Sequence, residues 1–345
     1  MDTAIELPLR VNSRSLSHAL TAGSVVSDPP APKTWRLHDD GYGASPCPSH
    51  LTEPRPRLRR VIAAVVRSLR PRQWTKNLLV AAAPLAAGKL FEAPVWWQTL
   101  VAFIAFCALS GAVYLVNDAV DVESDRAHPR KRLRPIAAGE LPVRTALVVA
   151  AVLGFAAIAA GTAVTWRLGL LLVTYAALQV AYSLWLKHEP VLDLAVVSVG
   201  FLMRAVSGGL AAGLPLSGFF LMVAGFGSLF MVAGKRYSEL HSLGNEAGTR
   251  PSLVRYTPSY LRFVWSIAAT STALAYCLWA FQQANDDIPW QSISIVPFVL
   301  GLLRYAVDID LGRAAEPEDV ILSDRGLQAI GLVWFVLVSL GVLGG

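Results

Sequence analysis

Charged residues are scarce in this sequence, and their scarcity indicates the class of protein. Only 16% of the 345 residues are Asp, Glu, Lys or Arg, and 54% are hydrophobic, whereas soluble domains carry about 25% charged residues. The charges are also uneven, because long apolar stretches alternate with short clusters of Arg, Lys and Asp. Since about 20 apolar residues in a helix cross a bilayer core of about 30 Å, the sequence predicts an all-α polytopic membrane protein.

Cysteine is scarce as well. The three residues, Cys47, Cys107 and Cys277, lie far apart and form no CxxC or Cys/His spacing. The sequence therefore argues against a disulfide framework and against a zinc site.

Residues 1–57 differ in composition from everything after them. They are rich in Pro, Ser and scattered charge, and they show no sustained apolar periodicity and no signal-peptide segment. We predict a disordered cytosolic tail here, followed by a single transmembrane catalytic domain over residues 58–345. The basic, amphipathic stretch 57–70 could lie along the membrane surface ahead of the first span.

Nine apolar stretches are candidate transmembrane helices. The first of them is short and contains Pro84. The stretches cover approximately residues 75–90, 95–116, 143–164, 167–186, 190–212, 216–234, 259–282, 288–307 and 326–343.

Basic residues are concentrated in alternate loops, which explains the net charge of +6 without a nucleic-acid partner. By the positive-inside rule, the N-terminus and the loops after spans 2, 4, 6 and 8 are expected in the cytosol of a plasma-membrane protein, and the C-terminus outside. The basic residues of these loops are Arg126, Arg130, Lys131, Arg132, Arg134, Lys187, Lys235, Arg236, Arg250, Arg255, Arg313 and Arg325.

An acidic motif, N-D-A-V-D-V-E-S-D, follows the second span. Asp118, Asp121 and Asp125 are spaced i, i+3, i+7, so they form one stripe if the helix continues, because successive residues turn by about 100°. Like charges at this spacing repel each other, unless a cation lies among them. Mg²⁺ prefers oxygen ligands and is often held by carboxylates together with substrate phosphates. The alternative is a solvated acidic helix end.

Basic residues follow the acidic motif directly. Arg126, Lys131, Arg132 and Arg134 are candidates for phosphate contacts, since a metal on one side and Arg or Lys on the other suit a polyphosphate. Positive-inside bias alone explains some of these residues, but not the acids beside them.

Polar residues also border the fifth span. Tyr182, Lys187 and Asp193 lie in the segment before it and could all face the same cytosolic pocket; Lys187 could equally be a membrane-surface anchor, and Tyr182 an interface aromatic. Arg204 lies eleven residues after Asp193, on nearly the same helix face. An ionisable residue at membrane depth is a functional candidate, and the alternative is a structural pairing.

The segment G-K-R-Y-S-E-L follows the sixth span. Lys235 and Glu239 are spaced i, i+4 and share a helix face. An ordinary salt bridge explains them, or Glu239 adds a carboxylate opposite the Asp118 stripe.

Together, these motifs resemble the UbiA superfamily of intramembrane prenyltransferases, and within it the branch of mycobacterial decaprenyl-phosphate phosphoribosyltransferases. The motifs that carry the resemblance are RPRQWTKN (Arg70–Asn77), NDxxDxxxDRxHPxKRxRPIAAG (Asn117–Gly139), YSxxLKHxPVxD (Tyr182–Asp193) and GKRYSE (Gly234–Glu239). The resemblance covers about residues 65–343. It implies nine helices around a central cavity, with Mg²⁺ and a diphosphate under the cytosolic loops.

The resemblance also implies a reaction and roles for residues. Phosphoribosyl pyrophosphate (PRPP) and decaprenyl phosphate would give decaprenylphosphoryl-5-phosphoribose, a precursor of cell-wall arabinan, and pyrophosphate. Asp118, Asp121, Asp125 and Lys187 would be catalytic, with Asn117 and the three aspartates at Mg²⁺. The expected substrate-binding residues are Lys76, Asn117, Arg126, Lys131, Arg132, Arg134, Tyr182, Asp193, Arg204, Lys235, Arg236 and Glu239.

One residue departs from the wider superfamily. A second motif, DxxxD, usually follows the sixth helix, and Lys235 stands here where its first acid would be. A lysine suits a donor with an extra negative group, and the 5-phosphate of PRPP is such a group.

Three alternatives remain open at this stage. The first is an aromatic prenyltransferase that uses a polyprenyl diphosphate and 4-hydroxybenzoate; the missing DxxxD motif argues against it. The second is a transporter, in which ionisable groups would lie near the midplane and inverted repeats are common. The third is a structural scaffold, which would not need aligned carboxylates. A homo-oligomer is possible, because the Gly209–Gly213 spacing suits helix packing within or between chains.

Overall fold

The computed structural model describes residues 57–243, 255–283 and 288–343, and this part of the chain contains helices and no strand. The all-α prediction is therefore confirmed. The predicted tail lies outside the described residues, apart from Arg57, which begins helix α1 (Arg57–Ser68).

Eight of the helices in the described residues are long and apolar enough to cross a membrane. They match the second to ninth predicted spans, most ends agreeing within a few residues. The helices are α3 (Ala93–Val120), α5 (Val143–Val164), α6 (Trp166–Leu184), α7 (Pro190–Ala211), α8 (Gly218–Leu243), α9 (Pro258–Gln282), the pair α10 (Trp290–Ile293) and α11 (Ile295–Asp310), and α13 (Arg325–Leu343).

The first predicted span, which is short, is not among the eight helices that are long and apolar enough to cross a membrane in the described residues. Residues 75–90 fall in a 3₁₀ segment, η1 (Pro71–Ala81), and a short helix, α2 (Ala82–Ala86). The 11 residues of η1 rise about 2.0 Å each and the five of α2 about 1.5 Å. Together they extend about 30 Å, the thickness of a hydrocarbon core. The stretch is thus about as long as a hydrocarbon core is thick, although it has fewer residues than any of the eight long spans.

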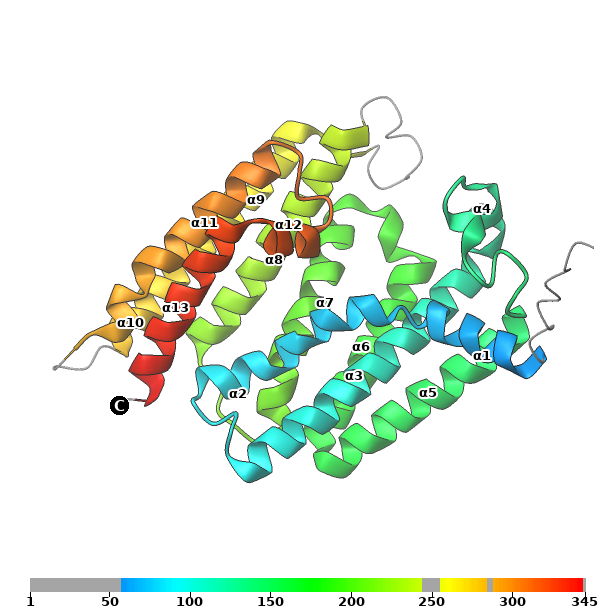
Figure 1. The fold of residues 1–345 in the computed structure, drawn as a ribbon, viewed down its shortest axis with the longest axis horizontal. Helices are drawn as coiled ribbons and strands as arrows, with labels where there is room; N and C mark the ends of the chain where they lie inside the picture. Colours follow the sequence, from blue (N-terminus) through cyan, green and yellow to red (C-terminus); the bar gives the residue numbers. More distant parts are fainter. Residues whose placement is uncertain (1–56, 244–254, 284–287, 344–345) are drawn as a thin grey trace, which may run out of the picture. The chain divides into compact units, whose positions relative to one another are not determined.

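Contacts at its two ends confirm that this segment runs the length of the bundle. Arg70, just before η1, donates a hydrogen bond of 2.6 Å to Asp118 at the C-terminal end of α3. Gly88, just after α2, lies against Val342 near the end of α13. Figure 1 shows the segment in blue, crossing α3 and α7.

Helices α3 and α7 are the most buried of the eight spans. Helix α7 contacts α3, α6, α8, η1 and α2, so it lies at the centre of the bundle. Its close contact with η1 depends on Gly208, because a Cβ atom at this position would overlap the carbonyl oxygen of Val80.

Replacing Gly208 with alanine is expected to destabilise the protein by about 1–3 kcal/mol, because the backbone of η1 would have to shift. The matched control is Gly225→Ala on α8, where the nearest atom to a new Cβ is Leu202 Cδ2 at 3.8 Å. The midpoint of thermal unfolding in detergent micelles measures both. Equal midpoints for the two variants would contradict the direct packing of α7 on η1.

The predicted cytosolic segments gather at one end of the bundle, as Figure 1 shows for α4 (Val122–Ala127) and α12 (Pro317–Ser323). Two short 3₁₀ turns also lie in the predicted cytosolic loops: η2 (Lys131–Leu133) follows α4, and η3 (Leu186–His188) lies between α6 and α7. Ion pairs join segments that are distant in sequence, such as Lys187 with Asp121 at 2.8 Å. Helix α13 ends at the opposite end of the bundle (Figure 1).

Candidate active site

The acidic motif lies where α3 ends and α4 begins. Asp118 is in the last turn of α3, Asp121 lies between the two helices, and Asp125 is on α4. The amide of Asp121 donates to the Asn117 carbonyl at 2.9 Å and that of Asp125 to the Asp121 carbonyl at 2.8 Å, so the backbone continues on a nearly helical path. Asp118 and Asp125 are almost fully buried, at 2% and 1% exposure.

Each of the three carboxylates has a basic partner. Arg134 donates to Asp118 at 3.1 Å and to Asp125 at 2.7 Å. Asp118 also accepts from Arg70, and Asp121 accepts from Lys187 on η3 at 2.8 Å. The shared Arg134 brings Asp118 and Asp125 together as the predicted stripe requires, whereas Asp121 has a different partner.

The motif's oxygen atoms suit a hard cation. Within the described ranges, no group of three His, Cys, Asp or Glu residues is already arranged around a metal position. However, Asp125 Oδ1 is buried without a hydrogen-bond partner, and the Nζ atom of Lys131 is 4.0 Å away. Because Mg²⁺ usually binds one or two carboxylates together with substrate phosphates, the residues fit an ion that arrives with its substrate. The assignment of the ligands remains a prediction.

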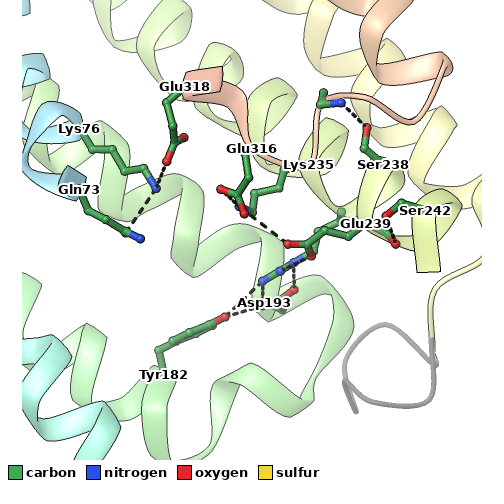
Figure 2. Close-up of polar contacts among 12 residues, drawn as sticks. Gln73, Lys76, Tyr182, Asp193, Lys235, Ser238, Glu239, Ser242, Glu316 and Glu318 are labelled. Atoms are coloured by element: carbon green, nitrogen blue, oxygen red, sulfur yellow. Dashed lines mark hydrogen bonds and ion pairs between the residues drawn. The ribbon is translucent and has the colours of Figure 1, made fainter. Parts of the chain in front are cut away.

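A second cluster joins α6, α7 and α8. Arg236 on α8 donates two hydrogen bonds of 2.9 Å to Asp193 of α7, which is fully buried. It donates a third hydrogen bond, also of 2.9 Å, to Glu239. Tyr182 donates a hydrogen bond of 2.7 Å to Asp193. Figure 2 shows Tyr182, Asp193 and Glu239 in this cluster. Tyr182 and Asp193 are therefore neighbours, whereas Lys187, which was expected to face the same pocket, pairs with Asp121. Their role in a common pocket stays a prediction.

A third group of contacts connects η1, α8 and α12 (Figure 2). Lys76 on η1 lies 3.4 Å from Glu318 of α12. Lys235 on α8 lies 3.3 Å from Glu316 and 3.8 Å from Glu239. Burial alone would raise the pKa of Glu318, but its own backbone amide and the nearby Lys76 and Lys235 outweigh burial and lower the pKa. Glu318 is therefore ionised at neutral pH.

A chain of contacts links this third group to the acidic motif. The amide oxygen of Gln73 accepts from Lys76 at 3.5 Å and from Tyr114 at 2.8 Å. The guanidinium of Arg70 lies 4.7 Å from the centre of the Tyr114 ring and bonds to Asp118. The polar residues at this end of the bundle are therefore parts of one network.

Arg204 lies within α7, and its guanidinium forms hydrogen bonds with other residues of the protein. Its guanidinium donates to Asn77 at 2.8 Å, to the Gly200 carbonyl at 2.7 Å and to Tyr175 at 2.7 Å. It also lies over the Phe106 ring. These contacts join η1 to α6 and α7, which favours the structural alternative; its role as a substrate ligand remains a prediction.

Three predicted residues have few contacts with this network. Asn117 is half-buried at the end of α3, Arg126 donates to the Ala137 carbonyl at 3.2 Å, and Arg132 is exposed. A pocket of about 790 Å³ lies elsewhere, between α11, α12 and α13, and is lined by residues such as Arg304, Asp308 and Asp324. None of the predicted site residues lines it.

Several members of the network were not predicted from the sequence. Arg70 belongs to the motif RPRQWTKN, which pointed to this segment without assigning the residue a role. Glu316 and Glu318 form an acidic run, E-P-E-D, just before the last span, and this run is the signal that could have found them. The network residues that were not predicted are Arg70, Gln73, Tyr114, Glu316 and Glu318.

A bundle of apolar helices with an acidic and basic network at one end defines an integral membrane protein with a polar site at the membrane boundary. The model of the UbiA prenyltransferase family matches residues 78–323, and the chain belongs to this family. The resemblance inferred from the motifs is therefore confirmed.

The similar proteins extend this assignment. Over 291 residues the chain is 49% identical to a Mycobacterium tuberculosis protein named decaprenyl-phosphate phosphoribosyltransferase, covering 83% of this chain and 96% of that protein. It is 48% identical over 299 residues to the protein of the same name from Mycolicibacterium smegmatis, covering 82% and 94%. The structure of a UbiA homologue from Archaeoglobus fulgidus bound to DMAPP and Mg²⁺ matches with a TM-score of 0.64, at 16% identity, over 81% of this chain and 99% of that one. The latter match supports the fold.

Proposed function

We propose that this enzyme transfers 5-phosphoribose from PRPP to decaprenyl phosphate, or a similar polyprenyl phosphate, and releases pyrophosphate. The observation that carries the proposal is the 49% identity to the M. tuberculosis phosphoribosyltransferase along 96% of its length. The lysine at position 235 supports it, because a cation there suits a donor that carries a phosphate in addition to its diphosphate. The product would serve the synthesis of cell-wall arabinan.

The acidic motif is proposed to bind the diphosphate of PRPP through Mg²⁺. When bound, Mg²⁺ supplies neutralisation of the negative charge that develops on the leaving pyrophosphate. Asp118, Asp121 and Asp125 would hold it, with Asn117 orienting them. The buried Oδ1 atom of Asp125, which has no hydrogen-bond partner, supports this assignment.

The basic partners of the aspartates gain a second role in this proposal. Arg70, Arg134 and Lys187 already lie within hydrogen-bond distance of the motif, so a diphosphate bound at the motif would lie beside all three cations. The bond from C1 of ribose to pyrophosphate breaks, and an oxygen of the lipid phosphate forms the new bond to C1. Because a lipid phosphate is already anionic, the reaction needs no general base; the protein positions the substrates and stabilises charge.

The charged end of the bundle is proposed to face the cytosol at the plasma membrane. The concentration of basic residues in the loops at this end supports this orientation. PRPP would enter from the cytosol, and the lipid would enter from the bilayer.

A paired transfer assay on purified protein tests the proposal. One reaction contains Mg²⁺, labelled PRPP and decaprenyl phosphate; the other contains Mg²⁺, decaprenyl diphosphate and 4-hydroxybenzoate. We expect the label of PRPP to enter an organic-extractable lipid, and EDTA to abolish the transfer. Product in the second reaction alone would establish an aromatic prenyltransferase instead, and activity in neither would contradict both enzymes.

A further inference from the structure

Two lysines from different parts of the bundle are held by one short acidic segment. Lys76 on η1 pairs with Glu318, and Lys235 on α8 pairs with Glu316. The two glutamates are two residues apart, so their Cα atoms are separated by at most about 7 Å. The ammonium groups of both lysines therefore lie beside the same short acidic segment. Figure 2 shows both lysines pointing toward the glutamates.

The ion pairs are of a kind that exchanges easily. Glu316 is 60% exposed and Glu318 is 34% exposed, and the lysines retain 28% and 25% exposure. The distances of 3.3 and 3.4 Å are longer than a tight charge-assisted hydrogen bond. Because none of the four side chains is fully buried and both distances are long, these pairs contribute modest stability. An anion with more charge would therefore compete for both lysines.

Other carboxylates in the network are held differently. Asp193 is fully buried and bound by Arg236 through two hydrogen bonds. Asp118 is buried between Arg70 and Arg134. Lys76 and Lys235 differ from these arginines because Glu318 and Glu316 are much less buried than Asp118 and Asp193, although Lys235 also lies 3.8 Å from Glu239.

We propose that Lys76 and Lys235 form one binding site for a phosphate monoester, and that Glu318 and Glu316 fill this site until the phosphate of a substrate displaces them. The inference rests on the proposed function and deepens it. The two glutamates act as specificity determinants: a substrate must carry a monoester phosphate, which has about two negative charges and three acceptor oxygens, to replace two carboxylates. A sugar diphosphate without this group would leave the glutamates in place.

Two phosphates of the proposed reaction have this chemistry. One is the 5-phosphate of PRPP, and the other is the phosphate of the lipid acceptor. Both are monoesters, so the site's composition alone fits either of them. Steady-state kinetics with each substrate varied in turn will tell them apart.

The test is a pair of charge-neutralising substitutions, Glu316→Gln and Glu318→Gln, in the full-length protein. We expect the double variant to lower the KM for the substrate whose phosphate uses the site by roughly 3- to 10-fold, because the competing carboxylates are gone. Lys76→Gln is expected to raise the same KM by at least about 10-fold, since it removes a charged hydrogen-bond donor to the phosphate. A lower KM for PRPP assigns the site to the donor, and a lower KM for decaprenyl phosphate assigns it to the lipid.

The control is Glu189→Gln. Glu189 is also 60% exposed and pairs with a basic residue, Arg255, at 3.5 Å. Among the described residues, it forms no ion pair with Lys76 or Lys235. Both KM values of this variant should equal those of the wild type. If loss of any exposed negative charge lowered KM, Glu189→Gln would lower it in the same way as the Glu316 and Glu318 substitutions.

Two failures can be told apart. If the wild type transfers phosphoribose but the double variant has unchanged or higher KM values for both substrates, the anion site is contradicted and the proposed function stands. If the wild type does not use PRPP, the proposed function fails. PRPP binding measured by thermal-shift titration gives a readout independent of turnover, and an affinity unaffected by Lys76→Gln would also exclude PRPP as the occupant.

Discussion

Replacing Asp118 with asparagine is expected to reduce phosphoribose transfer by about 10³-fold, the scale of a lost electrostatic contact to the transition state. Asp118 is 2% exposed and accepts hydrogen bonds from Arg70 at 2.6 Å and Arg134 at 3.1 Å. Asparagine keeps the shape but removes the charge that would hold Mg²⁺ and orient both arginines. The measurement is kcat with saturating PRPP and decaprenyl phosphate, together with the elution volume of the variant in detergent.

A matched variant separates this effect from a general loss of charge. Asp310, at the end of α11, also pairs with an arginine, Arg262, at 3.0 Å, but both side chains are more than half exposed. Asp310→Asn should retain nearly full activity. A well-folded Asp118→Asn protein with wild-type kcat would refute the assignment of the acidic motif to catalysis.

Replacing Arg236 with alanine is expected to destabilise the protein by about 3–5 kcal/mol, the usual cost of breaking a buried ion pair from one side. Arg236 is the partner of the fully buried Asp193 and of Glu239, which is 8% exposed. Without it, Asp193 and Glu239 would remain buried and would lose the guanidinium that bonds to both. The free energy of unfolding in mixed micelles measures the loss.

Two further proteins make the result specific. Arg262→Ala removes an exposed arginine and should cost less than about 1 kcal/mol. Adding Asp193→Asn and Glu239→Gln to Arg236→Ala should recover part of the lost stability, because the buried charges are removed as well. If Arg236→Ala cost no more than Arg262→Ala, the cluster would not be a structural support of α7 and α8.

Much of the architecture can be predicted from the sequence because a bilayer constrains helices strongly. An apolar interior requires long apolar runs whose backbone groups are satisfied within the helix, so α5 begins and ends at the predicted residues, 143 and 164. The same constraint segregates the charged residues into loops. The first predicted span does not follow this pattern, because its residues form the 3₁₀ segment η1, packed closely on Gly208, and the short helix α2.

Parts of the candidate site were also accessible from local spacing. The i, i+7 separation predicted that Asp118 and Asp125 share a face, and Arg134 bonds to both. Spacing within a helix determines such neighbours whatever the rest of the chain does.

Partners from distant segments depend on the packing of the helices. Arg70 lies 48 residues from Asp118, and Lys235 lies 81 residues from Glu316, so no local pattern connects them. Local spacing and apolar length therefore determined the spans, the charged end and the acidic stripe. The tertiary structure decided which acids and bases from distant segments form pairs, because only the packing of the helices brings these side chains within the few ångströms over which ion pairs form.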